Sequence, residues 1–203
     1  MTEPVPPAAR NRGPLLILLA LFAVPLALAF LLHYGLGWRP GKGIQHGDLL
    51  HPARPLAEVS LLRADGRETG PGFLRGRWSL VYVGDGSCDA SCRQALVDTR
   101  QIRSALNRDA SRVQRLFLYS GELHDATRIA GEHPDLVMAR IDNAPGAELL
   151  RAFPEYDGVL ATSAERVYIV DPLANLVLSY PKTADRRGLL EDLERLLKLS
   201  HIG

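Results

Sequence analysis

The apolar positions divide the chain into one uninterrupted apolar run near the N-terminus and a longer region of mixed pattern. Residues 14–32 (PLLILLALFAVPLALAFLL) are 19 residues without a charge. At a rise of 1.5 Å per residue, a helix of that length spans roughly the 30 Å hydrocarbon core of a bilayer. Pro25 removes one backbone hydrogen bond, which spanning helices tolerate. The run predicts a transmembrane anchor, preceded by a short tail over residues 1–13.

A cleavable signal peptide is the alternative interpretation of this run. Ala27-Leu28-Ala29 has the small-x-small form of a cleavage site. The run continues through Leu32, past the point of cleavage, which favours an uncleaved anchor. Basic residues flank both ends, so the charge rule sets the orientation only weakly. A short tail before an early anchor is expected to stay inside. In a bacterium, the soluble domain would then lie in the periplasm, on the outer side of the inner membrane.

Residues 33–55 are rich in Gly, Pro and His and show no periodicity, so we expect a tether there. The domain over residues 56–203 alternates between two periods. Short β-rich runs predict strands, and apolar residues at helical spacing predict helices. The predicted strands are 58–63, 78–83, 113–119, 136–141, 166–170 and 175–180; the predicted helices are 89–107, 125–132, 147–152 and 185–199. This order predicts an α/β fold with a mixed sheet flanked by helices.

Charge excludes one broad class of partner. The chain has 24 Lys and Arg, of which Arg10 and Arg12 precede the anchor, and 23 Asp and Glu, of which Glu3 does. The remainder therefore carries 22 charges of each sign. General nucleic-acid binding needs a basic excess, so we do not expect it. Two cysteines cannot build a disulfide-rich framework or a four-cysteine zinc site, but they can form one pair.

That pair, Cys88 and Cys92, follows a predicted buried strand and begins a predicted helix. Backbone N–H groups and the dipole at a helix N-terminus favour a thiolate, and a spacing of four brings both sulfurs to one face. The nearby acids Asp85 and Asp89 oppose this effect on the thiol pKa values. The pattern favours redox or metal chemistry over a structural bridge, because so small a loop constrains the unfolded chain little. We expect Cys88 to be the more exposed cysteine, which attacks or receives a disulfide, and Cys92 to resolve it.

These residues resemble the SCO/SenC family. The likeness runs from about Pro55 to the C-terminus and includes the strand before the Cys-x-x-x-Cys pair, Leu74–Trp78, and the late stretch Val167–Pro172. It implies a thioredoxin-like fold and a membrane-anchored protein that helps to assemble the copper centre of cytochrome c oxidase. The implied partner is the copper-binding cysteine pair of an oxidase subunit or of a copper chaperone.

The chain departs from the family at two positions. Asp89 stands where the family usually has Pro, and Ser163 stands where the resemblance implies a copper-binding histidine. Two thiolates can still hold the soft ion Cu(I), so Cys88 and Cys92 stay candidate copper ligands. His124, after a predicted central strand, is the candidate third ligand, because α/β folds place their sites at that end of the sheet.

Two functions from different classes remain open on this sequence. In the first, the protein is an assembly factor that works by thiol–disulfide exchange, by Cu(I) handling, or by both. In the second, it is a non-catalytic docking protein of the same pathway, which the acidic neighbours of the cysteines and the absent histidine favour. The sequence leaves open whether the protein is an enzyme. A general disulfide reductase is disfavoured, because such enzymes have two residues between their cysteines and a proline loop facing them, and residues 162–166 contain no proline.

Overall fold

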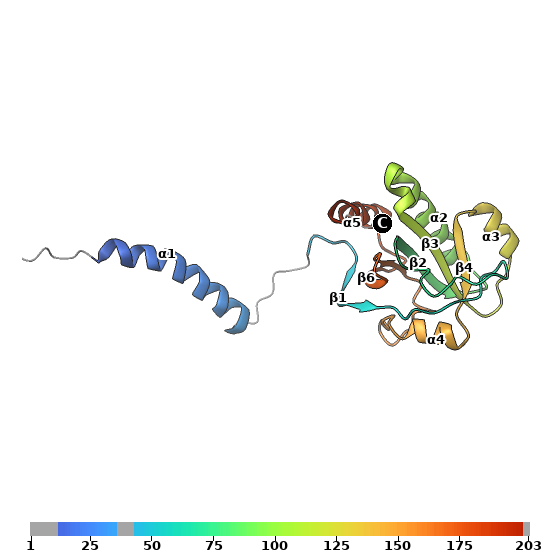
Figure 1. The fold of residues 1–203 in the computed structure, drawn as a ribbon, viewed down its shortest axis with the longest axis horizontal. Helices are drawn as coiled ribbons and strands as arrows, with labels where there is room; N and C mark the ends of the chain where they lie inside the picture. Colours follow the sequence, from blue (N-terminus) through green and yellow to red (C-terminus); the bar gives the residue numbers. More distant parts are fainter. Residues whose placement is uncertain (1–11, 36–42, 201–203) are drawn as a thin grey trace, which may run out of the picture. The chain divides into compact units, whose positions relative to one another are not determined.

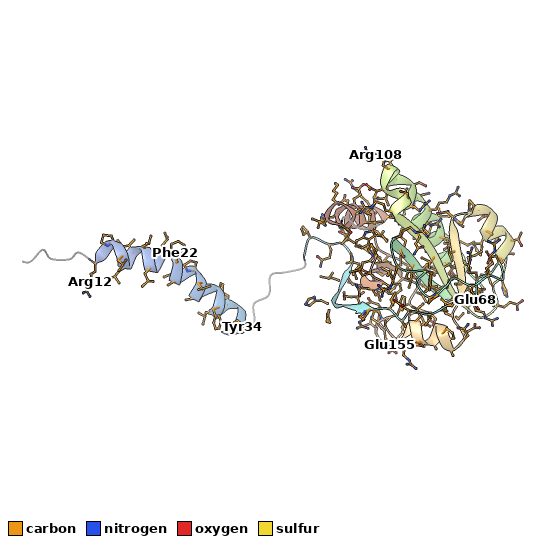
Figure 2. All side chains as sticks on the ribbon, viewed as in Figure 1. Arg12, Phe22, Tyr34, Glu68, Arg108 and Glu155 are labelled. Atoms are coloured by element: carbon orange, nitrogen blue, oxygen red, sulfur yellow. A yellow bond between two sulfur atoms is a disulfide. The ribbon has the colours of Figure 1, made fainter. Side chains whose placement is uncertain are left out.

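The computed structural model describes residues 12–35 and 43–200, and the chain falls into two compact units, Met1–Ile44 and Gln45–Gly203 (Figure 1). The predicted tail up to residue 11 and residues 36–42 of the predicted tether lie outside the described residues. In the first unit, α1 (Gly13–Phe30) continues into one π-helical turn, η1 (Leu31–Gly35). Side chains such as Phe22 project outward from α1 (Figure 2). The helix is long and apolar enough to cross a membrane, properties that a signal sequence shares.

The second unit is a six-stranded mixed sheet in the order β1-β6-β5-β2-β3-β4. Its strands are β1 (Asp48–Pro55), β2 (Trp78–Asp85), β3 (Val113–Ser120), β4 (Leu136–Arg140), β5 (Val167–Val170) and β6 (Asn175–Tyr180). Its helices are α2 (Ala90–Ala105), the 3₁₀ helix η2 (Asn107–Arg112), α3 (Ala126–Glu132), α4 (Ala144–Leu150) and α5 (Arg186–Leu199). The mixed sheet flanked by helices confirms the predicted fold class.

Two parallel strands, β2 and β3, lie side by side inside the sheet and are buried on both faces. Buried parallel strands need apolar residues on both sides, which explains their almost continuous apolar runs. Alternate residues of β2 point to opposite faces. Val81 and Val83 pack on the side covered by α4 and residues 56–74, whereas Leu80 and Tyr82 pack on the side of α2, α3 and α5 (Figure 1).

Two predictions about the N-terminal part of this unit are wrong. Residues 48–55, predicted as tether, form the edge strand β1, which pairs antiparallel with β6. Most side chains of β1 are exposed and the strand contains Pro52 and Pro55, so its sequence shows no alternation of apolar and polar residues. Proline is tolerated in β1 because the outer side of an edge strand forms no backbone hydrogen bonds with a neighbouring strand. Residues 58–63, predicted as a strand, make only isolated bridges, one of them from Arg63 to Ala139 of β4. Their alternation reflects Val59 and Leu61, which pack into the core.

The sequence pattern predicts the start of α4 at residue 147, but the helix begins at Ala144. The helix begins three residues earlier because the Asn143 side chain accepts a hydrogen bond from the Gly146 N–H at 2.9 Å and caps it. Pro145 lies in the first turn, where a missing N–H costs nothing. The Asn-x-Pro sequence was the available signal for this boundary.

Candidate functional site

Cys88 and Cys92 form a disulfide between the end of β2 and the first turn of α2, with their Cα atoms 5.0 Å apart. The strand, the turn and the helix therefore bring the two sulfurs together as the sequence predicted. Cys88 lies before the helix, and Cys92 is its third residue. The bridge lies at the carboxyl end of β2, the end at which α/β folds build their sites.

The loop that carries Cys88 is held by its own hydrogen bonds. The Asp85 carboxylate accepts from the Ser87 N–H at 2.8 Å, and the Asp85 carbonyl accepts from the Cys88 N–H at 3.2 Å. Hydrogen bonds from the side chain and the backbone of Ser87 hold the pKa of Asp85 below its usual value. Cys88 itself has φ 41°, in the left-handed region that non-glycine residues rarely occupy. This turn directs the chain from β2 into α2.

Asp89 is the N-cap of α2, and its carboxylate accepts from the Cys92 N–H at 2.9 Å. A helix N-terminus favours a thiolate, and nearby acids oppose it. In the structure, the Asp89 carboxylate accepts the hydrogen bond from the Cys92 backbone N–H. Asp89 therefore satisfies a helix N–H group that a cysteine thiolate could otherwise use.

Both cysteines are buried, each with 3% of its surface exposed, so the prediction that Cys88 is the more exposed is wrong. The bridge packs in one apolar cluster with side chains of β2, α2 and β3, among them Tyr82, Leu96 and Phe117. Burial, with Glu165 and Asp89 nearby, raises the pKa of the Tyr82 phenol, so it stays protonated at neutral pH. The bridge therefore lies at the border of the core.

A groove of about 230 Å³ opens beside the bridge. Its lining residues come from the cysteine loop and from the segment before β5: Tyr82, Gly84, Asp85, Ser87, Asp89, Cys92, Thr162, Ser163 and Glu165. Cys92 lines this groove and Cys88 does not. Glu165 forms an ion pair with Lys182. Tyr82 and Glu165 are site residues that the sequence does not predict. Tyr82 lies in the strand directly before the cysteine pair, whereas no local pattern marks Glu165.

Among the described residues, the candidate copper ligands Cys88 and Cys92 do not come together with a third donor. Ser163 lines the groove opposite the bridge, in the region where the resemblance implies a histidine. His124 is exposed, and its backbone N–H donates to the Gly86 carbonyl at 2.9 Å. Within residues 12–35 and 43–200, no three His, Cys, Asp or Glu side chains are grouped to hold a metal ion. His124 therefore contacts the cysteine loop through its backbone and does not complete a three-ligand site with Cys88 and Cys92.

Gly86 is the point at which the cysteine loop meets the loop after β3. A Cβ atom at this position would lie 2.4 Å from the Glu122 carbonyl oxygen. We expect Gly86→Ala to lower the free energy of unfolding by about 2 kcal/mol, as overpacking does, and to speed reduction of the bridge. Urea unfolding of the oxidised chain and the rate of bridge opening by dithiothreitol measure the two effects. Gly72→Ala is the matched control, since its Cβ would meet nothing within 4 Å. Equal stability of the two variants would contradict the prediction.

The fold and the cysteine pair at the start of α2 define a thioredoxin-like protein. A family model described as "Transmembrane-like, thioredoxin-like, C-terminal domain" matches residues 78–200, more than half of the chain. The chain belongs to this family. No curated protein sequence matches it.

Solved structures of SCO proteins share the fold. The apo Sco1 protein of Thermus thermophilus superposes with a TM-score of 0.59 at 17% identity, over 77% of this chain and 99% of that one. The copper-bound structures of yeast Sco1 (TM-score 0.58, 16% identity, 71% and 89% of the chains) and Arabidopsis thaliana ScoI (0.57, 18%, 76% and 99%) are similar. At these identities the likeness concerns the fold, and it confirms the thioredoxin-like architecture that the SCO/SenC resemblance implied.

Proposed function

We propose that this protein is a membrane-anchored factor that assists cytochrome c oxidase assembly by thiol–disulfide exchange at Cys88 and Cys92. The observation that carries the proposal is the position of the bridge, at the border of the core with a groove reaching Cys92. A purely structural bridge over so short a loop would contribute little stability. The partner would be the copper-binding cysteine pair of an oxidase subunit or of a copper chaperone.

The exchange needs no group beyond the two pairs of cysteines. A thiolate of the partner attacks one sulfur of the bridge, and the other sulfur leaves as a thiolate. The second partner thiolate then attacks the mixed disulfide. The partner dithiol loses two electrons and becomes a disulfide, and the Cys88–Cys92 bridge gains them. The reverse sequence reduces a partner disulfide, which would prepare its cysteines to bind copper.

Copper would be a cargo of the reduced protein. Cu(I) prefers soft thiolate ligands, and the two thiolates of Cys88 and Cys92 suit it once the bridge is open. A nitrogen donor for Cu(II) would have to come from the partner, because Ser163 stands in place of the implied histidine. Cu(I) handling therefore follows reduction, and thiol–disulfide exchange is the primary proposed activity.

A titration of the full chain in mild detergent with dithiothreitol redox buffers, read by thiol labelling, tests the proposal. We expect two thiols to appear together as the buffer becomes more reducing and to disappear on reoxidation. Cysteines that never cycle between thiol and disulfide would contradict the exchange proposal.

Equilibrium dialysis with Cu(I) tests the cargo role. The reduced protein should retain about one Cu(I), and the Cys88→Ser, Cys92→Ser double variant should retain none.

A non-catalytic docking role is the second candidate, and the 3% exposure of both cysteines favours it. A small exposed fraction slows attack by a bulky partner, whereas docking would use the rest of the surface. The double-serine variant separates the two functions in cells that depend on this protein. Loss of oxidase activity is expected for exchange, and full activity for docking alone.

The proposed location is the inner membrane, with α1 as the anchor and the α/β domain in the periplasm. A disulfide persists in that oxidising compartment and would be rare in the cytosol. Intact cells treated with a membrane-impermeant phosphine reductant and then with an impermeant maleimide should label the cysteines. Labelling that requires lysis would place the domain inside.

A further inference from the structure

The two sulfurs of the bridge differ in what lies beside them. Cys92 lines the 230 Å³ groove, and Cys88 does not. On the side of Cys88, its carbonyl accepts a hydrogen bond from Arg93 at 2.8 Å. The preceding Gly86 is held against the loop after β3, because its N–H donates to the Ser120 carbonyl at 2.7 Å. Attack on a disulfide needs approach to the sulfur that is attacked, and although both cysteines are 3% exposed, Cys92 is the one that borders the groove.

The charged groups that line this groove are all acidic: Asp85, Asp89 and Glu165. Asp85 and Asp89 are exposed at its rim. Lys182 pairs with Glu165 and offsets one of the three charges. The Arg93 guanidinium at the Cys88 carbonyl offsets a second, so the net charge beside Cys92 is about minus one. This negative charge repels an anionic thiol and attracts a thiol that carries a positive charge.

From these two observations we propose that the groove admits a cysteine flanked by positive charge, whose thiolate attacks the Sγ atom of Cys92. The new S–S bond joins the entering sulfur to Cys92, and the bond to Cys88 breaks, so that Cys88 leaves as a thiolate. A second thiolate of the same substrate then attacks its own sulfur in the mixed disulfide and releases Cys92. The substrate dithiol is oxidised by two electrons and the bridge is reduced by two. This inference rests on the proposed function and assigns the attack to the sulfur opposite to the one expected from the sequence.

Three small thiols of different charge test the electrostatic part. The probes are cysteamine (cationic), 2-mercaptoethanol (neutral) and 3-mercaptopropionate (anionic), used with the oxidised full chain in non-ionic detergent. Rates of bridge opening are divided by the rate at which the same probe reduces a small uncharged disulfide, which removes differences in thiolate fraction and in nucleophilicity. With a net charge near minus one at about 8 Å, we expect roughly a two-fold fall in rate from each probe to the next at low salt. The differences should shrink at about 0.5 M salt. A flat or reversed order would overturn the inference.

The attacked sulfur is identified by mapping the first adduct. The reaction with cysteamine is quenched early in acid, free thiols are alkylated, and the chain is cleaved before aspartate, which separates Cys88 from Cys92 at Asp89. We expect cysteamine on the Cys92 peptide and the alkyl group on the Cys88 peptide. The opposite distribution, or an equal mixture, would overturn the assignment.

Glu165→Gln and Glu122→Gln form a matched pair of variants. Glu165 lines the groove, whereas Glu122 is an exposed acid on the loop after β3 and does not line it. Glu165→Gln should reduce the preference for cysteamine over 3-mercaptopropionate by at least two-fold, and Glu122→Gln should leave it unchanged. An unchanged preference in Glu165→Gln would count against the inference. If every probe opens the bridge at one rate, the inference fails and the proposed function stands; if none opens it, both fail.

Discussion

Replacing Asp135 by alanine is expected to lower the free energy of unfolding by about 3 kcal/mol, because it leaves a buried arginine without its carboxylate. The Arg115 side chain, on the central strand β3, has no exposed surface, and its Nη1 lies 3.0 Å from the Asp135 carboxylate. The other guanidinium nitrogens donate to Thr99 and to the Leu96 carbonyl of α2. Burial lowers the pKa of Arg115, and Asp135 is the group that opposes this shift. Without Asp135 the positive charge would stay buried and unpaired.

Urea unfolding of Asp135→Ala, Arg115→Met and the double variant measures the effect. Arg115→Met should cost less, about 1–2 kcal/mol, because Asp135 is 30% exposed and still lies 3.4 Å from Arg103. The double variant should be more stable than Asp135→Ala alone, since no buried charge is left. Glu58→Ala is the control: its exposed pair with Arg75 should contribute less than about 0.5 kcal/mol. A greater loss in Arg115→Met than in Asp135→Ala would contradict this account.

Arg115 also connects the sheet to the helix that carries the site. Its hydrogen bond to the Leu96 carbonyl lies one helical turn beyond Cys92 in α2. Thr99, which accepts from Arg115, lies on the same buried face of that helix. The buried cation therefore fixes α2 over β3 without entering the groove, so it is a structural residue whose loss would also change the position of Cys92.

The sequence predicts the central parts of this fold because burial repeats there with the period of the element. Residues 78–83 and 113–119 are recognisable as strands since parallel strands covered on both faces need apolar residues throughout. Arg115 breaks that pattern, and its partners at residues 96, 99 and 135 are known only after folding. The edge strand β1 is not predicted because its side chains are exposed and it contains two prolines. No burial pattern marks it, and it is defined by its pairing with β6.

The site also has one part that the local sequence predicts and another that depends on distant residues. Cys88 and Cys92 can be predicted to meet because four residues at the start of a helix determine their separation. Their burial and the groove beside them depend on residues 162–165, which are some 70 positions away along the chain. Glu165 therefore has no local signal that would place it beside a disulfide. The charge of the groove is therefore set in part by a segment that no local pattern connects to the cysteines.

Asp192 is the second position at which we expect a large effect, because one buried carboxylate holds the start of the α/β domain against α5. Its side chain is 2% exposed, and it accepts hydrogen bonds from the His46 and Gly47 N–H groups at 2.7 and 3.2 Å and from the Tyr180 hydroxyl at 2.8 Å. Asp192→Ala leaves these donors without an acceptor and should cost about 3 kcal/mol. Glu191→Gln, at the neighbouring half-exposed position, is the control and should change stability by less than about 0.5 kcal/mol.

The contribution of Asp192 should also depend on pH. Burial alone would raise its pKa, but the hydrogen bonds from His46, Tyr180 and Gly47 hold it below the usual value. A carboxyl whose pKa is lower in the folded state than in the unfolded state stabilises the fold fully above about pH 4 and loses this effect as the pH falls through the folded value. The ionisable side chains that face it are His46, Tyr180, Glu191 and Arg195. Stability of the wild type measured from pH 6 to pH 3 should therefore fall more steeply than that of Asp192→Asn, which has no proton to take up at this position. Parallel curves would mean that the carboxylate charge does not stabilise the fold and that only its hydrogen bonds hold residues 46 and 47 on α5.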